Sequence, residues 1–132
     1  MYAMMIDLKL KQIQHEVETW RRMLLYMQEE NIHLKNRLSE VLKDRFDKKM
    51  LEVVEAFQSK FIMQDDLITS LKKEVAAIEE TPYAKTILSE NITHPSEKNI
   101  AEIRNNLETA EKMFAEVKTD FNNYLSENIN EK

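Results

Sequence analysis

The 132-residue sequence contains no glycine and only two prolines, Pro82 and Pro95. Glycine supplies the positive-φ positions of tight hairpin turns and of phosphate-binding loops, so its absence excludes glycine-rich nucleotide sites and disfavours β-hairpins. The residues before Pro82 contain neither strong helix breaker and are rich in Glu, Lys, Leu, Met and Gln, which favour helix. These absences predict an all-α protein.

Cysteine is also absent, which excludes disulfides, a thiol nucleophile and thiolate metal sites. No apolar run approaches the ~20 residues that span a bilayer. The formal net charge is −5, and no segment has the excess of Lys and Arg that neutralises nucleic-acid phosphates or anionic lipids. We therefore expect a cytoplasmic protein that binds neither nucleic acid nor membranes, and we identify no cofactor.

Three stretches carry apolar residues at alternating steps of three and four, the heptad spacing of helices that pack along their length. The first stripe comprises Leu10, Ile13, Val17, Trp20, Leu24, Met27, Leu34, Leu38 and Val41, with polar Asn31 among them. The second comprises Met50, Val54, Phe57, Phe61, Ile68, Leu71, Val75 and Ile78, with polar Gln64. The third comprises Ile100, Ile103, Leu107, Ala110, Phe114, Val117, Phe121 and Tyr124. The spacing predicts three long helices, over about residues 5–43, 49–80 and 96–126.

The first two stripes do not share a register, because Val41 and Met50 are nine residues apart rather than seven. A break between two helices explains this offset, and Asp44 or Asp47 in the charged stretch between them is suited to cap the second helix.

The connector 81–95 separates the second and third stripes. It begins with Thr81 and Pro82, a pattern typical of a helix start, and therefore predicts one short connecting helix. Pro95 and Ser96 are similarly suited to begin the third long helix. The expected architecture is a single helical-bundle domain over residues 1–132, in which a helical hairpin packs against a third helix.

An antiparallel hairpin of the first two helices brings the two polar stripe members together. When facing residues have numbers that add up to 95, the apolar layers match and Asn31 faces Gln64. A buried amide without a partner costs ~1–3 kcal/mol. We therefore expect Asn31 and Gln64 to form a polar pair in the core that sets the register. The alternative is a parallel homodimer in which Asn31 faces its symmetry mate.

The sequence contains no recognisable catalytic constellation. His15 and His33 fall at outward heptad positions, and Glu30-x-x-His33 lacks the second Glu-x-x-His of a di-iron bundle. No Ser or Thr has a histidine at the spacing of a nucleophile and its base. We expect no metal, no catalytic residue and no small-molecule substrate.

Apolar residues outside the three stripes exceed what one further helix covers, which favours association with a second molecule. The residues that we nominate for this interaction surface are Met4, Met5, Ile6, Leu8, Leu25, Ile32, Ile62 and Met63. We expect a non-enzymatic structural or protein-binding module, a scaffold or adaptor that forms a homodimer or binds another protein.

The alternative function is a signalling component that uses a surface histidine. The segment His33-Leu34-Lys35 faintly resembles the histidine phosphotransfer family. It departs from that family because lysine follows the histidine by two residues rather than three and because no glycine is present.

Overall fold

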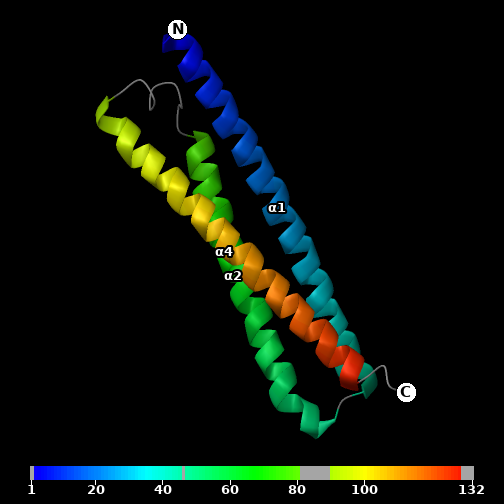
Figure 1. Cartoon of the computed structure of the whole chain (residues 1–132). Coiled ribbons are helices and arrows are strands. Elements are labelled where there is room, and N and C mark those ends of the chain that lie inside the picture. Colours follow the sequence, from blue (N-terminus) through cyan, green and yellow to red (C-terminus); the bar gives the residue numbers. More distant parts are fainter. Residues whose placement is uncertain (1, 46, 81–89, 129–132) are drawn as a thin grey trace.

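The computed structural model describes residues 2–45, 47–80 and 90–128, and the regular structure within these ranges is entirely helical. Three long helices, α1 (Tyr2–Arg45), α2 (Leu51–Glu80) and α4 (Glu90–Asn128), form an elongated bundle (Figure 1). α2 runs antiparallel to both of its neighbours, and α1 and α4 run in the same direction. The predicted all-α fold of three long, antiparallel-packed helices is confirmed.

Asp47 caps the turn that joins α1 to α2. A 3₁₀ turn, η1 (Lys48–Met50), precedes α2, and the Asp47 carboxylate accepts a hydrogen bond from the Lys49 backbone N–H at 3.1 Å. The Asp47 carbonyl accepts another from the Met50 N–H at 2.9 Å. Because a side-chain oxygen here satisfies an amide that lacks a helical partner, Asp47 acts as the predicted cap. The side chain of Asp44, the other candidate, is outside the described part.

α4 begins at Glu90, six residues before the predicted start at Ser96, and Pro95 lies inside the helix. A proline lacks one backbone N–H and so removes one intrahelical hydrogen bond, but the residues on its amino-terminal side can still be helical. Pro95 was therefore the wrong boundary marker, and residues 90–95 of the expected connector belong to α4. The short helix predicted in the remainder of the connector falls on residues 81–89, which the structure does not describe.

The core is built from the stripe residues and is anchored by aromatic rings where α2 begins and α4 ends. Phe61 and Phe121 are fully buried and lie edge to face, with 5.2 Å between their ring centroids. The centroid of the Phe57 ring lies 5.1 Å from that of Phe121 and 5.7 Å from that of Tyr124. Such contacts contribute about 0.5–1.5 kcal/mol each beyond the burial of their area. They fix α4 against α2 at this end of the bundle.

Polar contacts join α1 to α4 along one edge. Arg104 donates two hydrogen bonds to the Glu16 carboxylate, at 2.6 and 2.8 Å. Among the described residues, cross-helix pairs include Glu16–Arg104, Glu30–Lys118 and Arg37–Asn122. The residue numbers within each pair differ by 85 to 88. A nearly constant difference means that the two helices are parallel and in register over several turns.

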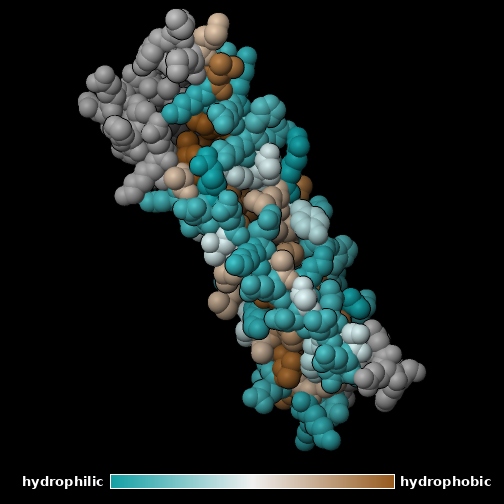
Figure 2. Space-filling model, viewed as in Figure 1, coloured by the Kyte–Doolittle hydropathy of each residue, from teal (hydrophilic) through white to brown (hydrophobic). Residues whose placement is uncertain are grey.

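The face of the bundle that is drawn in Figure 2 is mainly hydrophilic. Figure 2 shows polar side chains over most of the visible face, with smaller apolar patches between them. In the described ranges, no helix combines the length and the apolar character that a membrane crossing requires.

Candidate functional site

Asn31 and Gln64 share one buried layer of the α1–α2 hairpin. Gln64 Nε2 donates to Asn31 Oδ1 at 2.7 Å. Asn31 Nδ2 donates to the Phe61 carbonyl oxygen at 2.9 Å and to Asp65 Oδ1 at 2.7 Å. The two amides therefore face each other within one chain, as expected for a hairpin in which the numbers of facing residues add up to 95. That the pair sets the register remains a prediction.

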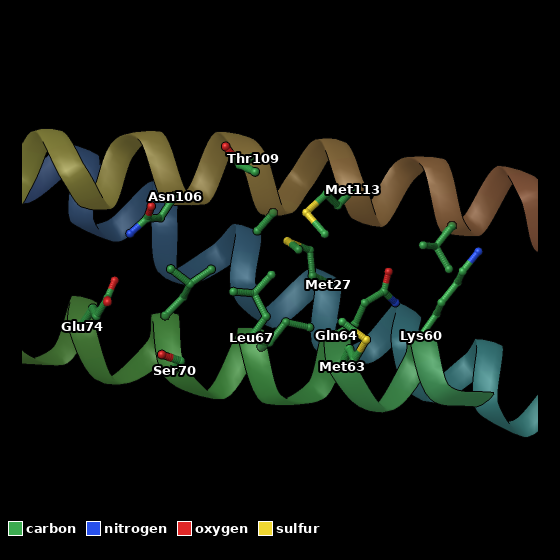
Figure 3. Close-up of a pocket in the computed structure, with 14 residues that line it drawn as sticks. Met27, Lys60, Met63, Gln64, Leu67, Ser70, Glu74, Asn106, Thr109 and Met113 are labelled. Atoms are coloured by element: carbon green, nitrogen blue, oxygen red, sulfur yellow. The ribbon is translucent and has the colours of Figure 1, made fainter. Parts of the chain in front are cut away.

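One hydrogen-bond acceptor in this layer is left over. Gln64 Oε1 is buried and has no donor among the described residues. An unpaired buried acceptor costs ~1–3 kcal/mol. In Figure 3 this oxygen points from α2 into the space between α2 and α4. The polar layer is thus complete on the side of α1 and incomplete on the side of α4.

That space is a groove of about 530 Å³, which we call the α2–α4 groove. Its volume is within the range of roughly 300–1,000 Å³ found for ligand sites. Met27 of α1 and three buried residues of α2 and α4 line its interior, namely Ile68, Leu71 and Ala110. Other apolar lining residues are Met63, Leu67, Met113 and Val117, and the polar ones besides Gln64 are Lys60, Ser70, Glu74, Asn106 and Thr109. The groove is therefore apolar inside, with polar groups beside it.

The α2–α4 groove has an acidic end and a basic end. Figure 3 shows Glu74 at one end and Lys60 at the other. Glu74 Oε2 is buried and has no hydrogen-bond donor among the described residues. The Lys60 ammonium lies 5.6 Å from the centroid of the Phe57 ring. Fourteen residues of helix separate the two charges, about 21 Å at 1.5 Å per residue, so they do not neutralise each other.

The opposite side of α2 faces α1, and its outer edge is closed by polar bridges. Lys35 forms an ion pair with Asp65. Lys72 Nζ donates to Gln28 Oε1 at 2.9 Å. These two contacts lie across the outer surface of the α1–α2 hairpin, which we call the hairpin face. Unlike the groove, the hairpin face has its cross-helix polar groups paired.

Three of the nominated apolar residues lie on the hairpin face. Leu25, Ile32 and Ile62 each precede a bridging residue by three positions, and residues three apart are neighbours on one side of a helix. Their side chains are 52%, 46% and 52% exposed. They therefore form an apolar row that no described helix covers.

The other nominated residues lie elsewhere. Met63, 66% exposed, lines the α2–α4 groove rather than the hairpin face. Met4 and Leu8 are exposed near the amino-terminal end of α1. The side chains of Met5 and Ile6 are outside the described part. The nominated surface is thus three separate places and not one patch.

The ion pairs of the α1–α4 edge shift the pKa values of their members. Lys118 holds the pKa of Glu30 below its ordinary value, mainly through their hydrogen bond, and the same contact raises the pKa of Lys118. The Tyr26 hydroxyl also donates to Glu30, at 3.3 Å. Glu16 raises the pKa of Arg104 in the same way. These pairs stabilise the charged forms and hold α1 to α4.

The two histidines of α1 lie on its exposed surface. His15 and His33 are both exposed, as their heptad positions predict. In the part of the chain that the structure describes, no group of three or more His, Asp or Glu side chains is placed to hold a metal ion.

The α2–α4 groove is the feature that the sequence did not reveal. The only signal was Ala110, a small residue in a stripe of large ones, which leaves room beside Leu71 in the groove. Comparison of the chain with models of protein families, with curated proteins and with solved structures finds no match.

Proposed function

We propose that the protein is a non-enzymatic helical scaffold that associates with itself or with another protein through apolar side chains outside its core. One observation carries the proposal: Leu25, Ile32, Ile62 and Met63 are 46–66% exposed, although the core of the bundle is already filled. Leu25, Ile32 and Ile62 form one row on the hairpin face and Met63 stands in the α2–α4 groove, and exposed apolar surface of this kind is typical of interaction sites. Each buried Å² of apolar area contributes ~25 cal/mol, so covering these side chains favours association.

The shape of the bundle suits a scaffold. α1 has 44 residues and is therefore about 66 Å long at 1.5 Å per residue. Polar bridges hold α1 to α2 and α1 to α4 along its length. A rod that is braced in this way holds binding surfaces at fixed positions, with the hairpin face on one side and the α2–α4 groove on another.

The test is the mass of the purified protein across a range of concentrations, measured by light scattering and analytical ultracentrifugation. We expect a dimer. A variant with Leu25, Ile32, Ile62 and Met63 all changed to Gln should associate more weakly, because it has less apolar surface to bury. The matched control changes exposed His15 and His33 to Ala and should associate like the wild type.

Two results count against the proposal. One is a wild-type protein that stays monomeric at the highest concentrations and forms no complex with another protein. The other is a quadruple variant that associates as strongly as the wild type. The His33→Ala change also tests the signalling alternative, since a phosphoryl group that is carried by the wild type and lost in this variant would support it.

A further inference from the structure

The side chains along the α2–α4 groove are arranged symmetrically about Leu67. Lys60 and Glu74 lie seven residues before and after it, and Gln64 and Ser70 lie three residues before and after it. All five line the groove. Seven residues are close to two helical turns, so Lys60, Leu67 and Glu74 lie along one side of α2. A two-fold axis through Leu67 therefore places the basic end of one α2 on the acidic end of another.

We propose that a second copy of this chain docks in the α2–α4 groove, with the two α2 helices antiparallel and Leu67 of one copy against Leu67 of the other. This inference rests on the proposed self-association and specifies the surface that carries it. A two-fold arrangement uses the same surface on both copies, which requires that the surface be complementary to itself. In the dimer, Lys60 of each copy faces Glu74 of the other, so the surface is complementary to itself at two places.

The second copy brings hydrogen-bond donors to the levels of Gln64 and Glu74, the two described residues of the groove that have an unpaired oxygen. Lys60 of the second copy brings an ammonium group to Glu74, whose Oε2 is buried without a donor. The exposed Ser70 hydroxyl of the second copy comes to the level of Gln64, whose Oε1 is also buried without a donor. An ammonium opposite a carboxylate and a hydroxyl level with an amide favour this partner over a purely apolar one, because the two surfaces are complementary in charge and polarity.

α4 repeats the same symmetry on the other wall of the groove. Met113 lines the groove and is about half-exposed. Asn106, which also lines the groove, lies seven residues before Met113, and Asp120, an exposed residue beyond the lining, lies seven residues after it. In the antiparallel dimer this spacing pairs an amide donor with a carboxylate. The two helices that form the groove are therefore both compatible with one two-fold axis.

Met63 provides the apolar group that enters the groove. Its side chain is 66% exposed and stands on the α2 wall. A groove packed against a groove leaves a void unless something projects into it. Methionine is flexible and fills irregular spaces well, so Met63 of each copy is suited to occupy the groove of the other.

Charge reversal provides the decisive experiment, with the dimer dissociation constant measured by sedimentation. Lys60→Glu and Glu74→Lys each place two like-charged contacts in the dimer, and each should raise the dissociation constant at least about tenfold. The double variant with both changes restores opposite charges and should dimerise like the wild type. Since the two positions are about 21 Å apart on one helix, rescue requires contact between two chains.

Mixing the two single variants sharpens the result. A Lys60→Glu chain and a Glu74→Lys chain have opposite charges at both contacts, so they should form a heterodimer more tightly than either forms a homodimer. Chemical denaturation of each variant shows whether the fold is retained. The matched control is Lys73→Glu, an exposed lysine of α2 that does not line the groove, and it should leave dimerisation unchanged.

Disulfide trapping tests the axis itself, because the natural chain has no cysteine. Leu67→Cys should oxidise to a covalent dimer, whereas Thr69→Cys, exposed on α2 outside the groove, should not. A wild type that dimerises while neither charge reversal nor Leu67→Cys has an effect would overturn the groove as the interface and leave the proposed function standing. A monomeric wild type would overturn this inference, and the proposed function would then rest on binding to another protein.

Discussion

The hairpin face and the α2–α4 groove lie on two sides of the same helix, but they differ in how their polar groups are paired. Across the hairpin face, Lys35 bonds Asp65 and Lys72 bonds Gln28. Across the groove, no hydrogen bond or ion pair joins a described side chain of α2 to one of α4. Both faces expose apolar side chains, so exposed apolar surface alone does not distinguish them. The unpaired buried acceptors of Gln64 and Glu74 distinguish the two faces, because both lie on the groove side of α2, where hydrogen bonding is incomplete.

The largest effect should come from removing the aromatic anchor that holds α4 to α2. Phe121 is fully buried against Phe57 and Phe61. Phe121→Ala should lower the free energy of unfolding by ~3–5 kcal/mol, because polar bridges between α2 and α4 do not compensate for the cavity. Urea denaturation measures this loss. Met113→Ala, a half-exposed control on the same helix, should cost less than ~1 kcal/mol. If Phe121→Ala lowers the free energy of unfolding no more than the control does, apolar packing is not what holds α4 to α2.

A smaller effect is expected in the Asn31–Gln64 layer, where Asn31 should matter more than Gln64. Asn31 takes part in three hydrogen bonds and Gln64 in one. We expect Asn31→Leu to cost ~2–3 kcal/mol and Gln64→Leu about 1 kcal/mol, since the second change also removes an unpaired oxygen. The double variant should be about as stable as the wild type, because two buried amides, one of them with an unpaired oxygen, are replaced by apolar packing.

A double-mutant cycle by denaturant unfolding measures the coupling between the two positions, which these values place at ~3–4 kcal/mol, at the upper end of what residues in contact show. The double variant should also be less specific in its register and oligomeric state, because no polar layer penalises a slip. If the two single effects add within about 0.3 kcal/mol, the amides do not depend on each other and the register must have another origin.

The smallest effect concerns the α1–α4 edge and its dependence on pH. Lys118 lowers the Glu30 pKa from its usual 4.5. A carboxylate whose pKa is lowered by folding contributes stability above its unfolded pKa, and this contribution is lost as the pH falls through the folded pKa. Because both side chains are partly exposed, Glu30→Gln should cost only ~0.5 kcal/mol at pH 7. The cost should vanish near pH 2, where the wild-type carboxyl is also neutral.

Urea unfolding of the two proteins at both pH values provides the measurement. Glu29→Gln is the matched control, since Glu29 is an exposed neighbour on the same helix. An equal loss of stability for Glu30→Gln at pH 7 and pH 2 would mean that the ion pair with Lys118 is not its cause.

Much of the fold follows from spacing, because heptad periodicity determines which side of each helix is buried. Val17, Trp20 and Leu24 are buried as their stripe requires, and Asn31 meets Gln64 as the match of the neighbouring apolar layers predicts. Periodicity was less informative at the end of α4, where Leu125 is buried and the stripe residue Tyr124 only partly so. A straight α-helix drifts relative to a strict heptad, so the buried side shifts along a long helix.

The groove was not predictable in the same way. It depends on the oblique path of α4 across α2, which is visible in Figure 1. That path reflects how the volumes of side chains on three helices fit together, for example small Ala110 beside Leu71 and large Phe114 one turn later. The spacing of residues in the sequence shows on which side of a helix a side chain lies, but not how far apart the axes of two packed helices are. The unpaired oxygens of Gln64 and Glu74 therefore became apparent only in three dimensions.

The parallel arrangement of α1 and α4 has a consequence for the order of folding. Cross-helix bonds within the hairpin join residues 30 to 44 positions apart, whereas those between α1 and α4 join residues 85 to 88 positions apart. Closing a longer stretch of chain costs more entropy, and contacts distant in sequence form more slowly. We infer that the contacts within the hairpin form before those between α1 and α4. Amide hydrogen exchange tests this order, since an edge that forms late should open at a lower free energy than the hairpin.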